Sequence, residues 1–211
     1  MPGRAAVLVE WTILTLLVAE ALGAFFAFGA GYSVLGSYRL VGSASLRRLA
    51  TGFFLLGFSQ TAALAMEGII QLAGAALPRE TFDIFDVLFW LHYGTLLVGL
   101  TFVFASFGRH PFRWMPAMAP LLLLAGPILE LLAILVLFFV VLHAGLNHIA
   151  RKGAGSVRVA VGFFLLFTAH TVNLVDYSAL LPRWWLAECI NLLGFVILFI
   201  AVQRPRVRSD G

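Results

Sequence analysis

The chain has 211 residues, of which 62% are hydrophobic and only 11% are charged, and its mean hydropathy is +1.00. A soluble domain has about 25% charged residues and an apolar share of about half. The composition therefore excludes a soluble globular enzyme, a disordered protein and a nucleic-acid-binding protein, and it predicts an integral membrane protein. Cys189 is the single cysteine, which excludes an internal disulfide and any paired-cysteine motif for metal or thiol chemistry.

Six segments are long and apolar enough to cross a bilayer, which requires about 20 residues. They are 7–31, 48–75, 84–108, 128–149, 157–178 and 184–203. The first has no basic stretch before it and no small-residue cleavage site, so we expect a mature span rather than a cleaved signal. A shorter, proline-rich segment, 111–127, is predicted to form a seventh, linking span.

The basic residues favour seven spans over six. With seven, eleven of the fourteen fall on one side of the membrane: Arg39, Arg47, Arg48, Arg109, Arg113, Arg151, Lys152, Arg158, Arg204, Arg206 and Arg208. With six, the basic loops would alternate between the two sides. Cytoplasmic loops carry an excess of Lys and Arg. The predicted fold is therefore an all-α, polytopic protein of the cell membrane with seven transmembrane helices, its N-terminus outside and its C-terminus inside.

The sequence also repeats itself. The run Gly-Phe-Phe-Leu-Leu occurs at 52–56 in the second predicted helix and at 162–166 in the sixth. At a constant offset of 95, residues of the third helix recur in the seventh; the matching pairs include Trp90 and Trp185, Gly99 and Gly194, and Arg109 and Arg204. Several matches in one order indicate an internal duplication.

The duplication predicts a 3+1+3 organisation. Residues 1–110 form the first three-helix repeat, 111–127 the linking helix, and 128–211 the second repeat with a short basic tail. Four helices separate equivalent ones, so the two copies share one orientation and are related by an axis along the membrane normal.

His92 and His170 are the most informative polar residues inside the predicted spans. Both are expected at the same depth in the outer half, on different helices. Two such imidazoles can ligate one b-type haem between them. Alternatively, they could bind a transition metal together with Glu67, or only hydrogen-bond to neighbouring helices.

Further polar residues accompany the histidines in the outer half. A carboxylate within a span costs about 2.5–3.5 kcal/mol on insertion scales, so it should face the interior of the bundle or be protonated. The predicted buried polar site consists of Glu67, Tyr93, Asn173, Asp176, Glu188 and Asn191.

Three functions remain open on this basis. The first is a small membrane subunit of a redox or respiratory assembly, carrying one haem b near the outer face and receiving electrons from other membrane subunits or an extracytoplasmic donor. The second is a transporter of a small solute or ion built on the repeat. The third is an accessory or sensory protein without a cofactor. No acid pair, nucleophile triad or phosphate-binding glycine loop occurs with useful spacing, so we expect no catalytic activity of its own.

Overall fold

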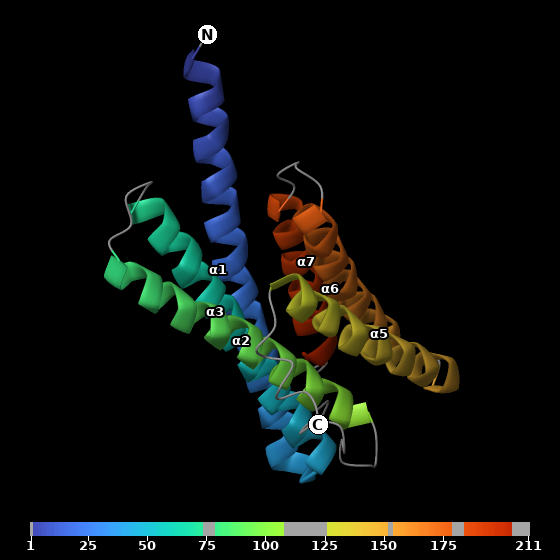
Figure 1. Ribbon diagram of the computed structural model, residues 1–211. Helices are drawn as coiled ribbons and strands as arrows, with labels where there is room; N and C mark the ends of the chain where they lie inside the picture. Colours follow the sequence, from blue (N-terminus) through green and yellow to red (C-terminus); the bar gives the residue numbers. More distant parts are fainter. Residues whose placement is uncertain (1, 74–78, 108–125, 152–153, 179–183, 204–211) are drawn as a thin grey trace, which may run out of the picture.

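The computed structural model describes residues 2–73, 79–107, 126–151, 154–178 and 184–203, and these ranges are helical almost throughout (Figure 1). The helices are α1 (Pro2–Val41), α2 (Ala44–Ala73), α3 (Arg79–Phe107), α5 (Gly126–Arg151), α6 (Ala154–Ser178) and α7 (Trp184–Val202). All six are long and apolar enough to cross a membrane. The chain is therefore a multi-pass membrane protein, as the composition predicts.

The number of spanning helices in the described ranges is six, so the prediction of seven is corrected. Most of the predicted linking span, 111–125, lies outside the described residues. Its last two residues, Gly126 and Pro127, begin α5 instead. A proline suits the first turn of a helix because its ring fixes the helical φ and its missing N–H would have no partner there.

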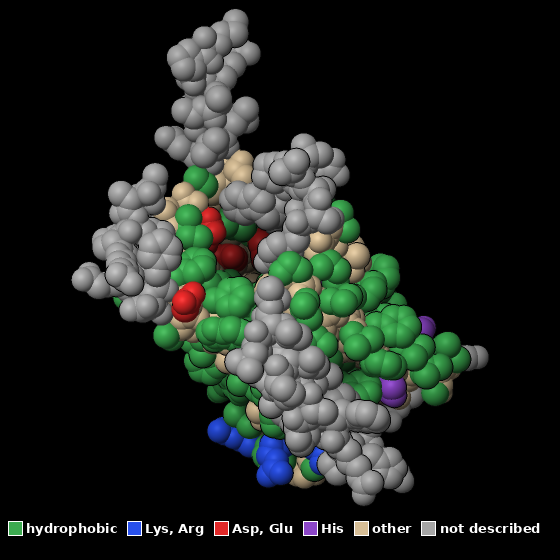
Figure 2. Space-filling model, viewed as in Figure 1, with side chains coloured by type: hydrophobic (Ala, Val, Ile, Leu, Met, Phe, Trp, Pro, Cys, Tyr) green, Lys and Arg blue, Asp and Glu red, His purple; other side chains and the backbone are tan. Residues whose placement is uncertain are grey.

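Large apolar side chains cover the outside of the bundle, as lipid contact requires (Figure 2). The exposed aromatic side chains include Phe25 and Tyr32 on α1, Phe58 on α2, Phe138 on α5 and Phe164 on α6. Water would not solvate a surface of this kind, whereas hydrocarbon would. The apolar helices therefore imply a surrounding bilayer.

The helices form a closed ring. In their main contacts each helix touches two neighbours, in the order α1, α2, α3, α5, α6, α7 and back to α1. Helices α1, α3, α5 and α7 run in one direction and α2 and α6 in the other (Figure 1). One end of the ring carries Arg39, Arg47, Arg48 and Arg158, and we call it the arginine end. The opposite end, where α2 ends and α3 begins, we call the acidic end (Figure 2).

Gly42 turns the chain between α1 and α2 at the arginine end. It has a φ of 69°, which residues with a Cβ rarely adopt, and its N–H donates to the Tyr38 carbonyl at 2.7 Å. This arrangement is a left-handed C-cap, which satisfies an end carbonyl of α1 and lets α2 start two residues later.

Positions matched by the sequence repeat make matching contacts in the structure. Gly52 lies against the Gly99 carbonyl where α2 crosses α3, and Gly162 lies against the Gly194 carbonyl where α6 crosses α7. Small residues let the helix backbones approach closely at both crossings.

Phe53 and Phe163 are a further matched pair, and they stack on one another with ring centroids 6.3 Å apart. Each is 1% exposed and belongs to the hydrophobic core. Their helices, α2 and α6, are not neighbours in the ring, so the two rings meet across its interior. This stack therefore marks the centre of the ring.

Candidate functional site

A cavity of about 560 Å³ opens into the half of the bundle nearer the acidic end. Figure 2 shows acidic side chains at the bottom of this hollow. Five of the six helices line it, with the residues Leu16, Glu20, Ala63, Met66, Glu67, Ile70, Phe85, Phe89, His92, Tyr93, Asn173 and Glu188. Its volume lies within the range of about 300–1,000 Å³ that is usual for small-molecule sites.

Three carboxylates, on three different helices, face this cavity. Glu67 accepts a hydrogen bond from the Gln71 side-chain amide at 2.7 Å. Glu188 accepts one from Asn191 at 3.2 Å and another from Asn173. The two residues thus receive amide donors, which stabilise a carboxylate without neutralising it.

Glu20 differs from the other two carboxylates. Its side chain is 5% exposed, and its Oε2 atom is buried without a hydrogen-bond partner. It lies close enough to Glu188 and Glu67 for their negative charges to repel a charge on Glu20. A buried carboxylate in this setting is costly unless a cation or a proton joins it. None of the described residues that line the cavity is Lys or Arg.

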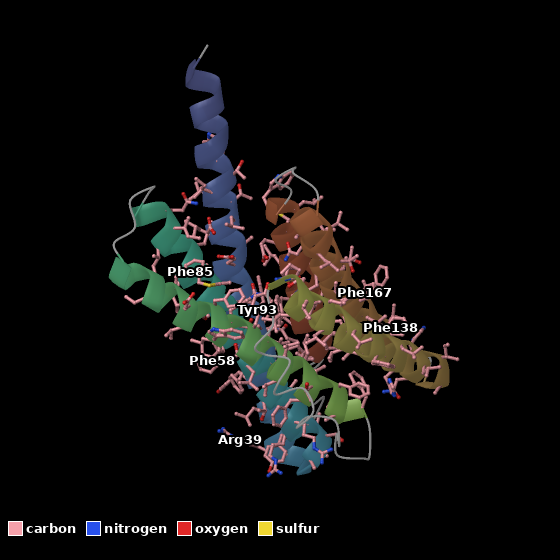
Figure 3. All side chains as sticks on the ribbon, viewed as in Figure 1. Arg39, Phe58, Phe85, Tyr93, Phe138 and Phe167 are labelled. Carbon is pink, nitrogen blue, oxygen red and sulfur yellow. The ribbon has the colours of Figure 1, made fainter. Side chains whose placement is uncertain are left out.

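The cavity wall on α3 is aromatic. Three aromatic residues follow one another along this helix: Phe85, Phe89 and Tyr93. The ring centroids of Phe89 and Tyr93 lie 4.9 Å apart. Figure 3 shows Tyr93 near the centre of the bundle and Phe85 closer to the acidic end. Aromatic faces attract cations, and their area binds apolar groups.

The two histidines are each held through one ring nitrogen. His92 Nδ1 lies 3.0 Å from both the hydroxyl and the carbonyl oxygen of Ser59. His170 Nδ1 lies 2.7 Å from Glu130 Oε1, and both side chains of this pair are buried. The two imidazoles lie close enough for their charges to interact.

Most of the residues predicted from the sequence come together here. Glu67, Tyr93, Asn173, Glu188 and His92 line one cavity. Asn191 supports Glu188, while His170 is adjacent but does not line the cavity. The side chain of Asp176 lies outside the described residues. In the described ranges no group of three His, Cys, Asp or Glu residues is arranged to hold a metal ion, so the predicted set of His92, His170 and Glu67 does not form a metal centre there.

Sequence reasoning does not single out Glu20 and Glu130 as site residues, although both are buried and central. The signal that could have found them is the repeat. Glu20 and Glu130 are 110 residues apart, the same separation as Gly52 and Gly162. Glu130 is thus the second-copy equivalent of Glu20, and His170 is the equivalent of Gln60.

Comparison with known protein families, with curated proteins and with solved structures finds no match to this chain.

Proposed function

We propose that this protein binds a small, partly apolar organic cation in the acidic cavity and carries it across the membrane. The observation that carries this proposal is the buried Glu20 carboxylate, whose Oε2 atom has no hydrogen-bond partner although it faces a cavity of about 560 Å³. A cation in the cavity would supply the missing partner. The aromatic wall on α3 would bind its apolar part.

Transport is favoured by the arrangement along the axis of the ring. A second, smaller cavity of about 170 Å³ lies between the helices and includes Phe53 and Phe163 in its lining. Those two rings do not line the acidic cavity, and on α2 the lining of the second cavity ends at Phe53 whereas that of the acidic cavity begins at Ala63. Two cavities with a barrier between them, in a fold of two parallel three-helix repeats, suit a carrier that exposes its site to each side in turn. We place the acidic end outside, because the arginine end fits the cytoplasmic side.

Binding of radiolabelled tetraphenylphosphonium to the purified full chain tests the proposal. Glu20→Gln keeps the size of the side chain and removes its charge. We expect it to raise Kd about 30-fold, which corresponds to about 2 kcal/mol for a buried charge that loses its partner. Asp86→Asn is the matched control, since Asp86 is exposed on α3 and does not line the cavity.

Tetraphenylborate has the same shape as this probe but the opposite charge, so it should not compete. Equal Kd values for Glu20→Gln and the unmodified protein, or competition by tetraphenylborate, would contradict the proposed cation site. Uptake of the bound probe into proteoliposomes then tests transport itself.

A b-type haem held by His92 and His170, in a redox subunit, is the second candidate. It is favoured by the bonds that fix both rings through Nδ1, because these leave each Nε2 atom available as a ligand. It is weakened by the surroundings, since haem carries anionic propionates and the adjacent cavity presents three carboxylates. An optical spectrum decides: reduced α and β bands, lost in His92→Ala and in His170→Ala, would support it. Protein that stays colourless after incubation with haemin would refute it.

A further inference from the structure

The buried pair of Glu130 and His170 lies outside the cation site yet next to it. His170 Nδ1 and Glu130 Oε1 are 2.7 Å apart, and the two side chains come from α6 and α5. Neither residue lines the acidic cavity. The function proposed above therefore leaves a buried titratable pair without a role.

The sequence repeat identifies the residues that stand at the equivalent positions in the first half. In the first half the equivalents are Glu20 on α1 and Gln60 on α2, and Gln60 packs one turn along α1 from Glu20, within 3.2 Å of the Cβ position of Gly23. A glutamine cannot carry a charge, and Glu20 Oε2 has no hydrogen-bond partner. In the second half an imidazole, which can hold a proton, meets the carboxylate directly.

From this comparison we infer that the pair of Glu130 and His170 is a proton-binding site that exchanges its proton against the organic cation bound at Glu20. The inference rests on the proposed cation site. The two halves would then hold the same kind of carboxylate site, one filled by an external cation and the other by a proton on His170. In the overall step, Glu20 is ionised throughout, the cation enters from the acidic end and pairs with it, and one proton leaves His170 for the solution. The net charge inside the bundle therefore stays constant.

Glu188 connects the two sites. It lines the acidic cavity, and its charge acts on Glu20, on Glu130 and on His170. Among the described side chains, the titratable groups whose charges act on His170 are Glu130 from α5, Glu188 from α7 and His92 from α3. Nearby carboxylates stabilise a protonated imidazole. A cation bound beside Glu188 opposes that stabilisation, so binding of the cation favours release of the proton.

The coupling must be reciprocal, because each ligand changes the affinity of the other by the same factor. Loss of the proton from His170 should therefore tighten binding of the cation. In the full chain, the Kd for tetraphenylphosphonium should fall as the pH rises, by at most about tenfold per pH unit for one exchanged proton.

The experiment measures proton release with a pH dye in weakly buffered solution when tetraphenylphosphonium is added to the purified full chain. We expect up to one proton per cation bound. His170→Gln introduces the residue that the first half already uses at this position. It should still bind the cation, but it should release no proton, and its Kd should no longer change with pH. Asp86→Asn should behave as the unmodified protein in both measurements.

Three outcomes separate the two proposals. If tetraphenylphosphonium does not bind at all, the proposed function fails and the coupling falls with it. If it binds without proton release, and with one Kd between pH 5.5 and 8.5, the coupling alone is refuted. Proton release that persists in His170→Gln also refutes the coupling, because the proton would then come from another group, such as Glu20. Should His170→Gln not fold, the pH dependence of Kd in Glu20→Gln decides instead, because that variant has no titratable group at position 20. A Kd that still falls as the pH rises supports the coupling, and a constant Kd refutes it.

Discussion

The crossings of α2 with α3 and of α6 with α7 offer a sharp test of the packing, because a single methyl group should damage one more than the other. A Cβ atom at Gly52 would lie 2.7 Å from Val103 Cγ2, 2.9 Å from the Gly99 carbonyl oxygen and 3.0 Å from the Val103 nitrogen. Two of these three neighbours are backbone atoms, which cannot move without separating the helices. Gly52→Ala should therefore force α2 and α3 apart.

The equivalent change in the second half, Gly162→Ala, places its methyl group mainly against side-chain atoms. A Cβ atom at Gly162 would lie 2.6 Å from Leu198 Cγ and 2.8 Å from Leu198 Cδ2, whereas the Gly194 carbonyl oxygen is 3.2 Å away. Leu198 is fully buried, but its side chain can shift without moving the backbone. Overpacking costs about 1–3 kcal/mol. We expect Gly52→Ala to lower the free energy of unfolding by about 3 kcal/mol, at the top of that range, and Gly162→Ala to lower it by about 1 kcal/mol.

Gly145→Ala is the control, since nothing lies within 4 Å of its Cβ position in the last third of α5. An alanine at an open helical position stabilises the helix by about 0.5–1 kcal/mol relative to glycine. Thermal unfolding in one detergent, followed by size-exclusion recovery, gives the order of stability. We expect Gly145→Ala to have the highest unfolding temperature, Gly162→Ala the next and Gly52→Ala the lowest. A Gly52→Ala protein as stable as the control would refute the close crossing of α2 and α3.

Three further predictions follow from the same contacts. Glu130→Leu should destabilise the protein by about 3–5 kcal/mol, because it removes one partner of a buried pair, and thermal unfolding beside Asp86→Asn measures the difference. Phe53→Ala should cost about 3–5 kcal/mol of stability and should let tetraphenylphosphonium leak through proteoliposomes that contain the variant. In a Cys189→Ser background, cysteines at Arg39 and Asp86 should react with a membrane-impermeant maleimide from opposite sides; labelling of both from one side would contradict the orientation of α1 and α3.

Much of this fold could be predicted from the sequence because the bilayer imposes simple rules. A spanning helix must be long and apolar, so five predicted spans lie almost entirely within described helices, and the first lies within the much longer α1. The repeated glycines were recognisable for a similar reason, since close helix crossings tolerate little else. The proline-rich segment was harder, because Pro127 suits the first turn of α5 as well as the end of a separate span.

The site was only partly predictable, for a different physical reason. Polar residues inside spans stand out, so Glu67, Tyr93, Asn173 and Glu188 could be identified as members of one site. Partners could not be assigned, because the depth of a residue does not reveal the helix face on which it lies. Equal depth suggests that His170 pairs with His92. In the structure, however, the Nδ1 atom of His170 bonds Glu130 on the neighbouring α5. Depth alone cannot distinguish two histidines that share a ligand from two that each bond a separate neighbour.

If the sequence repeat reflects a duplication, the differences between the two halves are where a function could have arisen. The matched glycines and the stack of Phe53 on Phe163 preserve the common packing near the axis. Away from it, the copies differ at several polar positions, and at one of them Gln60 stands where the second copy has His170. With the imidazole present, a buried carboxylate is satisfied from within the protein; without it, the carboxylate must find its counter-charge elsewhere. The cost of an unsatisfied buried charge is therefore the reason to expect a cation at Glu20 in the first half, and not at Glu130, which already has His170 as its partner.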